Sequence, residues 1–108
     1  MFIETKIFIV KKGTAGLVVE HFTPPGEIEK SPGFIDLSVM QKKTSRSGDE
    51  EVLVLIRWES EAAWKRWETS EPHLEGHRQA RGKSEPEHIV GFEHGYYKVL
   101  AAKKAETI

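Results

Sequence analysis

The feature that most constrains the fold is an unbroken apolar run, Val52-Leu53-Val54-Leu55-Ile56. A strand exposed on one face alternates apolar and polar residues, whereas a run without alternation is typical of a strand buried on both faces. The run therefore predicts a central strand in a sheet that is covered on each side. One layer of helices can cover one side, so the other side needs a second cover.

The segments around this run supply the rest of a small domain. Residues 2–10 and 34–41 are predicted as strands because of their β-branched and alternating residues. Thr14 is predicted to begin a helix that Pro24 stops, and Ser60 a second helix that Pro72 ends or kinks. The remaining segments are predicted as a polar hairpin loop (45–50), a further short helical turn or two (73–81), a loop (82–87) and a last strand (88–100).

The order strand, helix, strand, strand, helix, strand is that of the ferredoxin-like α+β fold (βαββαβ). In this fold both helices lie on one face of an antiparallel four-stranded sheet. Residues 1–100 are predicted to form this single domain and residues 101–108 a flexible C-terminal tail. The simplest cover for the free face of the sheet is the same face of a second copy, so a homodimer is expected.

The amino-acid composition limits the classes of molecule that this protein is expected to bind. Sixteen Lys and Arg against seventeen Asp and Glu give a net charge of −1, so no nucleic acid is expected. No apolar run approaches the roughly eighteen residues of a membrane helix, so no membrane is expected either. The chain has no cysteine and therefore no disulfide, thiolate ligand or thiol nucleophile, and its N-terminus lacks a leader pattern. These features favour a cytoplasmic location.

Trp67 and His77 are the first candidates for chemistry. They lie on either side of the Ser70 to Pro72 break, so consecutive helical pieces can turn both toward one cleft. His77 has no thiolate or HExxH companion that would indicate a zinc site, but a single neutral imidazole is what an axial haem ligand requires. The alternative is that Trp67 is core and His77 a solvated helix residue, and spacing alone favours this alternative.

The other aromatic and histidine residues have mainly structural interpretations. Trp58 is expected to seal the core, and Trp64 to do the same or to lie at the dimer seam. Neither a pair of catalytic carboxylates nor a glycine-rich phosphate loop is found. Four histidines have no assigned role: His21, His73, His88 and His94.

Several short motifs are specific in combination. Lys12-Gly13-Thr14-Ala15 opens the first helix, Ser31-Pro32-Gly33-Phe34 enters the second strand, and Trp58-Glu59-Ser60 leaves the third. With Ala63, Trp67 and His77, this pattern resembles the antibiotic biosynthesis monooxygenase superfamily. Within it, the chain is similar over about residues 2–100 to the small haem-degrading monooxygenases of the iron-regulated surface determinant type. The resemblance implies a dimeric α+β barrel with one haem per subunit. It also implies that O2 and electrons from an external reductase open the porphyrin ring and release iron.

The resemblance also implies residue roles. His77 matches the family's axial ligand to the haem iron, and Trp67 matches the tryptophan that presses the macrocycle out of plane. The family's distal asparagine falls on Lys6, whose charged ammonium on a flexible stem replaces a short neutral amide. Lys6 is expected either to donate to oxygen on the distal side or to pair with Glu4 or a haem propionate. Further haem contacts are expected from an apolar wall (Phe22, Val54 and Ile56) and from a cation near the propionates (Arg78 or Arg81).

The resemblance leaves three functions to consider. The leading expectation is a haem-degrading monooxygenase in which Lys6, Trp67 and His77 are catalytic. The alternatives are a cofactor-free oxygenase of the same superfamily acting on a quinol or polyketide, and a haem-binding dimer without turnover. The Trp67 and His77 pair favours haem, whereas Lys6 at the asparagine position favours binding without turnover.

Overall fold

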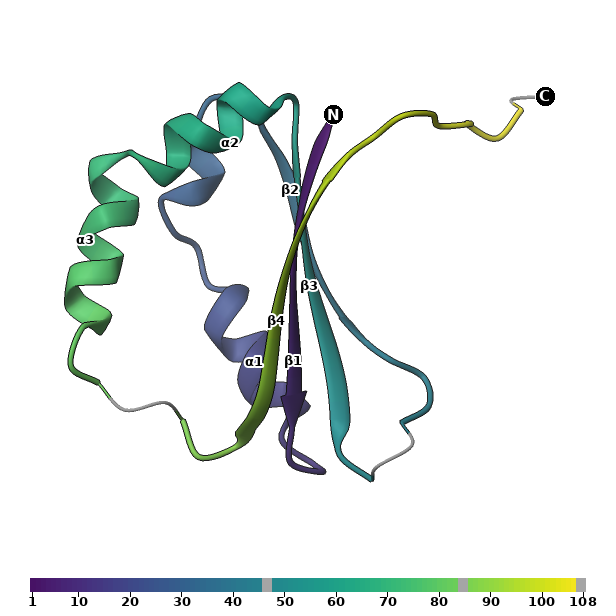
Figure 1. The fold of residues 1–108 in the computed structure, drawn as a ribbon, viewed down its shortest axis with the longest axis vertical. Helices are drawn as coiled ribbons and strands as arrows, with labels where there is room; N and C mark the ends of the chain where they lie inside the picture. The colour runs from purple at the N-terminus through teal and green to yellow at the C-terminus, as the bar shows by residue number, and fades with distance from the viewer. Residues whose placement is uncertain (46–47, 84–85, 107–108) are drawn as a thin grey trace.

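The computed structural model describes residues 1–45, 48–83 and 86–106. Its elements are β1 (Phe2–Val10), α1 (Ala15–Phe22), the 3-10 turn η1 (Ile28–Lys30), β2 (Phe34–Gln41), β3 (Glu50–Trp58), α2 (Glu61–Glu68), α3 (Glu71–Ala80) and β4 (Ile89–Lys98). The strands pair antiparallel in the order β2-β3-β1-β4. In Figure 1 all three α-helices lie on the same side of the sheet. The ferredoxin-like α+β fold and the central position of the 52–56 strand are confirmed.

Two predicted loops fall partly outside the described residues. The hairpin loop over 45–50 includes positions 46–47, and the loop over 82–87 includes positions 84–85, which are not described. The strand predicted over 88–100 is shorter in the structure, because β4 ends at Lys98.

Burial alternates along β3 in the single chain. Val52, Val54 and Ile56 are at most 2% exposed and lie under the helices. Leu53 and Leu55 are only half-buried, and they point to the opposite face. The expected burial of this strand on both faces requires a cover from a second copy of the chain, so for the face of Leu53 and Leu55 it stays a prediction.

Serine caps divide the second helical region into two helices. Ser60 begins α2 as predicted, since its hydroxyl oxygen accepts a hydrogen bond from the Ala63 N–H (3.1 Å). Ser70 begins α3 in the same way, accepting from the His73 N–H (3.4 Å). Pro72 lies in the first turn of α3, where a missing N–H costs nothing. The helical piece predicted over 73–81 is confirmed, but α3 begins earlier, at Glu71, and its 10 residues are more than the one or two turns expected.

The N-terminus of α1 is capped by a carboxylate from the sheet. The Thr14 side chain makes no cap, and its hydroxyl donates to the Lys11 carbonyl instead. Glu50 Oε1 accepts from the N–H of Ala15 (3.1 Å) and of Gly13 (2.9 Å). These hydrogen bonds, that of Ala15 foremost, lower the pKa of Glu50 below its ordinary value. Glu50 thus ties α1 to the first residue of β3.

Glu50→Gln is expected to lower the melting temperature at neutral pH. Because the pKa of Glu50 is lower in the folded chain, its ionised form stabilises the fold above the ordinary glutamate pKa of about 4.3. That stabilisation is lost as the pH falls through the lowered pKa, so wild type and variant should converge in acid. Thermal melts across pH check this, with Glu51→Gln, whose carboxylate faces Lys42 (3.9 Å), as the matched control. A difference that stays constant at every pH would contradict the capping role.

Two tryptophans pack as predicted from the sequence. Trp58 is fully buried and meets the Phe34 ring edge-on at 5.6 Å between centroids. Trp64 is half-buried between Phe2 (5.1 Å) and Tyr96 (5.0 Å). Both indoles therefore close the end of the core where α2 meets the sheet.

The chain leaves the sheet after β4. The Val99 N–H donates to the Met1 carbonyl (3.0 Å), and Leu100 beyond it is 95% exposed. Residues 99–106 have no regular secondary structure and point away from the sheet in Figure 1. The division into residues 1–100 and a tail stays a prediction. Within the described ranges, no helix has the length and apolar character needed to span a membrane.

Candidate functional site

Two adjoining cavities lie between the helices and the sheet, and together they form what is called the cleft below. The inner cavity, of about 340 Å³, lies between α1, η1 and the sheet, and the outer cavity, of about 380 Å³, lies beneath α3. Each is within the size range of small-molecule sites. Both are lined by His21, Trp67, Pro72 and His73. The inner cavity is lined further by Glu4, Lys6, Phe22, Pro24, Gly26, Glu27, Ile28, Glu29, Leu37, Ile56 and Glu68, and the outer by Gly76, His77 and Ala80.

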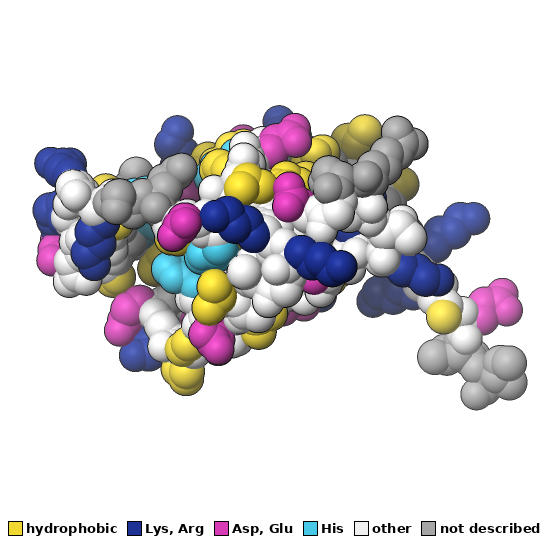
Figure 2. Space-filling model, turned by 90° about the horizontal axis from the view of Figure 1, so that it is seen from below, with side chains coloured by type: hydrophobic (Ala, Val, Ile, Leu, Met, Phe, Trp, Pro, Cys, Tyr) yellow, Lys and Arg dark blue, Asp and Glu magenta, His cyan; other side chains and the backbone are white. Residues whose placement is uncertain are grey.

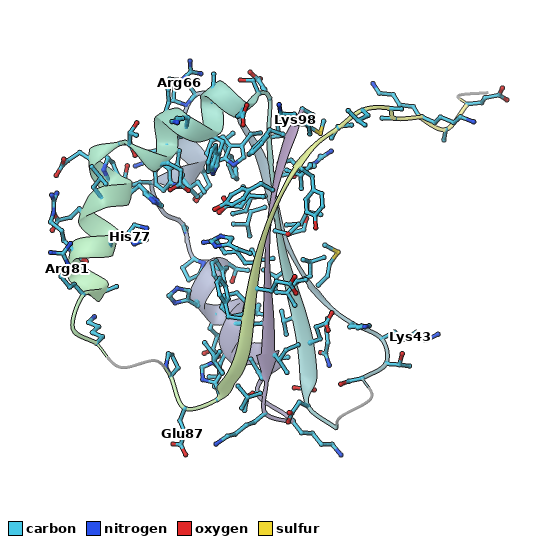
Figure 3. The ribbon with its side chains drawn as sticks, viewed as in Figure 1. Lys43, Arg66, His77, Arg81, Glu87 and Lys98 are labelled. Carbon is cyan, nitrogen blue, oxygen red and sulfur yellow. The ribbon has the colours of Figure 1, made fainter. Side chains whose placement is uncertain are left out.

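The histidine predicted as a ligand faces this cleft. In Figure 3 the His77 side chain leaves α3 on the side toward the sheet, whereas Arg66 on α2 points away from the molecule. At the end of the molecule seen in Figure 2, histidine side chains lie beside hydrophobic ones, with acidic and basic groups interspersed around them. The structure thus brings His77 and Trp67 to one cavity.

His73 stands between these two residues. Its ring meets Trp67 edge-on at 5.3 Å and His77 at 4.5 Å between centroids. Its Nε2 lies 3.0 Å from His77 Nε2 and 3.0 Å from Glu68 Oε2. The sequence left His73 without a role, although its position one helical turn before His77 places both on the same face of α3.

The environment of His73 disfavours its charged form. Burial, the largest cause, lowers the pKa of the His73 imidazole below its ordinary value. The Glu68 carboxylate raises it, while the charges of His77 and Lys6 lower it further. The effect of burial on the pKa of His73 is therefore larger than that of the neighbouring Glu68 carboxylate.

Lys6 reaches the inner cavity from β1. Its Nζ lies over the Phe22 ring, 5.6 Å from the centroid, which is within the range of a cation–π contact. Glu4 is also in this wall and is only 3% exposed, but its Oε2 lies 3.1 Å from His94 Nε2. Glu4, one of the partners expected for Lys6, is therefore paired with His94.

The remaining predicted contacts divide into two groups. Phe22 and Ile56 line the inner cavity. Val54 is fully buried in the core and lines neither cavity. The Arg78 guanidinium pairs with Glu71 and Glu75 on α3, and neither Arg78 nor Arg81 lines the cleft. The structure therefore does not bring Val54 and the two arginines to the residues that form the cleft.

The histidines of the cleft can supply one axial ligand to a haem iron, but they are not arranged to hold a free metal ion. Among the residues that the structure describes, no three His, Cys, Asp or Glu side chains are placed to hold a metal ion. A haem iron needs only one protein imidazole, because the porphyrin supplies four nitrogens.

Comparisons with known proteins agree with this geometry. The family model for antibiotic biosynthesis monooxygenase matches residues 1–79. The heme-degrading monooxygenase HmoA of Bacillus subtilis is 45% identical over 104 residues, covering 96% of this chain and 95% of HmoA.

Two solved structures resemble the fold. A crystal structure assigned to the antibiotic biosynthesis monooxygenases, from Bacillus cereus, has 58% identity and a TM-score of 0.84, covering 96% of this chain and 97% of that one. The heme-degrader MhuD of Mycobacterium tuberculosis, with two hemes bound, has 18% identity and a TM-score of 0.66, covering 96% and 100%. At that identity the likeness to MhuD shows the fold alone. By the family model and the 45% identical relative, the chain belongs to the antibiotic biosynthesis monooxygenase family.

Proposed function

We propose that this protein is a haem-degrading monooxygenase, which binds haem in the cleft, opens the porphyrin ring with O2 and external electrons, and releases iron. The observation that carries the proposal is the placement of an imidazole, His77, and a large indole, Trp67, on one cavity beside an aromatic and aliphatic wall. A relative that is 45% identical over nearly its whole length carries the name heme-degrading monooxygenase.

The residues of the cleft fit haem in their chemistry. A flat apolar macrocycle requires aromatic and aliphatic walls, which Phe22, Ile56 and Trp67 supply. Its iron requires a neutral nitrogen ligand, and His77 is the histidine that lines the outer cavity beneath α3. When bound, haem supplies both the iron at which O2 is activated and the carbon skeleton that is oxidised.

Trp67 has the task of pressing on the macrocycle. Its indole is half-buried, and the His73 ring packs against it edge-on, so it has little room to withdraw. A large rigid side chain held in this way would press against the face of a bound haem, and distortion of the macrocycle is one of the means by which a protein tunes haem.

Lys6 has the task of donating to oxygen on the distal side. Its ammonium group lines the inner cavity, and the carboxylate nearest to it along β1, Glu4, is bound to His94. An ammonium group has three donors and no acceptor, so Lys6 would act as a charged hydrogen-bond donor toward an oxygen ligand held in this cavity.

The proposal includes a homodimer and an external source of electrons. A second copy of the chain covers the free face of the sheet, where Leu53 and Leu55 lie with Ile3, Ile7 and the 58% exposed Tyr97. Because the chain has no flavin or nicotinamide motif, electrons come from a separate reductase. The cysteine-free composition supports a cytoplasmic location.

Titration of the purified protein with haem, followed by a reductant in air, tests this function. The expected result is a saturable shift of the Soret band, which then decays as iron becomes available to a ferrous chelator. A stable Soret band under reductant would favour a haem-binding protein without turnover. If haem produced no Soret shift, both haem functions would be excluded and a cofactor-free oxygenase would remain.

A further inference from the structure

We infer that Glu4 and His94 form a proton relay between the solvent beside β4 and the inner cavity of the cleft. This inference rests on the proposed function, because the relay supplies the protons that an oxygenation in this cavity consumes. Its two members are a buried carboxyl group and an imidazole that the sequence left without a role.

Glu4 is a buried ionisable side chain on the floor of the cleft. It is 3% exposed and lines the inner cavity, and among the described residues no other charged side chain is as buried. Burial removes the hydration of a carboxyl group at a cost in free energy that an apolar side chain would not carry. A residue that breaks the rule of an apolar core in this way, beside a cavity, indicates a chemical task.

The Glu4 carboxyl group is hydrogen-bonded to an imidazole on the neighbouring strand. Its Oε2 lies 3.1 Å from His94 Nε2. In the antiparallel register of β1 and β4, His94 lies opposite Lys6, two residues from Glu4 on the same face of the sheet. An ionised carboxylate accepts from the ring N–H, and a protonated carboxyl group donates to the ring lone pair, so the contact suits either state. A proton can therefore cross it without movement of either side chain.

His94 connects this carboxyl group to solvent. β4 is an edge strand, the His94 side chain is 37% exposed, and His94 lines neither cavity of the cleft. Its ring is held between Phe92 and Tyr96, each at 5.2 Å between centroids. The imidazole thus has one nitrogen on Glu4 while the exposed ring exchanges protons with water.

A route through the protein is needed once the cleft is filled. A flat ligand between α3 and the sheet would separate the floor of the cleft, where Glu4 lies, from its mouth. Other titratable groups line the inner cavity or contact the pair: Lys6, His21, Glu27, Glu29, Glu68, His73 and Tyr96. Burial foremost, with the charges of Glu4 and Glu68, raises the pKa of the Tyr96 phenol, which makes it a weaker acid. Among the described residues, His94 is the side chain hydrogen-bonded to Glu4.

The protons have a defined use. Inserting one atom of O2 into a carbon–hydrogen bond and releasing the other as water consumes two electrons and two protons. The electrons come from the external reductase. For each proton, His94 Nδ1 gains a proton from water as the Nε2 proton passes to Glu4 Oε2, and Glu4 releases its proton into the cavity. The ring then returns to its first tautomer by exchange with water, so neither residue is changed overall.

His94→Gln separates the relay from the hydrogen bond. The glutamine amide N–H can still donate to Glu4, but an amide does not take up and release protons at neutral pH. Reductive decay of bound haem should slow by at least about tenfold, because general acid catalysis typically contributes 10²–10⁴-fold. Haem affinity and the position of the Soret band should stay unchanged. His88→Gln is the matched control, because His88 lines neither cavity of the cleft, and its decay rate should equal that of the wild type.

Glu4→Gln tests whether the two residues act in series. It should slow haem decay to the same degree as His94→Gln, and the double variant should be no slower than either single one. Because proton delivery then limits the rate, both single variants should show a larger solvent deuterium isotope effect than the wild type. A cavity that is only distorted would slow the decay without this change.

Ring-nitrogen NMR on the haem-free protein checks the contact itself. The chemical shift of His94 Nε2 should change in Glu4→Gln. It should stay at its wild-type value in Glu68→Gln, because Glu68 lines the same cavity but lies 3.0 Å from His73 Nε2. An unchanged His94 shift in Glu4→Gln would contradict the hydrogen bond on which the relay depends.

The outcomes separate this inference from the proposed function. Equal decay rates in the wild type, Glu4→Gln and His94→Gln would overturn the relay alone, and so would slower decay with an unchanged isotope effect. A wild type that does not degrade haem would overturn the proposed function and the relay together, and that result needs no variant.

Discussion

Replacing His77 with alanine should weaken haem binding by more than about a hundredfold and abolish the Soret shift of the complex. Loss of an outer partner alone costs up to about a hundredfold, so loss of the ligand itself should exceed this. His77 lines the outer cavity and faces the sheet from α3, and its removal leaves the apolar walls of the cleft intact. Weak binding through those walls should therefore persist without the ligand's spectral signature.

His88→Ala provides the matched control for this variant. His88 precedes β4 and lines neither cavity of the cleft, so its loss should leave the Soret shift and the affinity unchanged. Circular dichroism of both variants checks that the fold is retained. Tight binding with an unaltered Soret band in His77→Ala would show that another residue, with His73 the nearest imidazole, holds the iron.

Gly33→Ala should destabilise the fold by about 2–4 kcal/mol, the largest effect on stability expected here. Gly33 has φ +87°, a left-handed conformation that an L side chain rarely adopts. A Cβ at this position would stand 2.4 Å from the Ala63 Cβ, so the start of β2 and the helix α2 would have to separate. The Gly33 carbonyl also accepts from the Glu59 N–H (2.8 Å), which limits any shift of this turn.

Gly13→Ala separates backbone strain from steric overlap. Gly13 has almost the same φ, +84°, but an added Cβ there meets nothing within 4 Å among the described residues. Its cost should be the conformational part alone, about 1–2 kcal/mol. Urea unfolding of both variants measures the difference, and equal losses would show that the contact with Ala63 can relax.

Much of the fold could be predicted from local signals. The 34–41 strand and the Ser60 cap depend on residues close together in sequence, and both are found where expected. The apolar 52–56 run indicated two covered faces, and a strand can be covered either by its own chain or by a second copy. Leu53 and Leu55 show that composition alone does not distinguish these cases.

The cleft was predictable in part. The break at Pro72 allowed Trp67 and His77 to turn toward one cavity, but spacing alone favoured a structural role, and the family resemblance was needed to select the pair that the structure brings together. The contacts of His73 and Glu4 were missed for different reasons. His73 depends on where α3 begins, which Ser70 sets, and the pairing of Glu4 with His94 depends on the register of β1 against β4, which brings together residues at opposite ends of the chain.

Iron released per bound haem is the measurement that tests the central claim most directly. The haem-loaded protein is exposed to a reductant and O2 with catalase present, so that free peroxide cannot bleach the haem, while a ferrous chelator reports iron. The account predicts close to one iron released per haem as the Soret band disappears, and almost none from His77→Ala. A Soret band that persists, or that decays only when catalase is omitted, would contradict it.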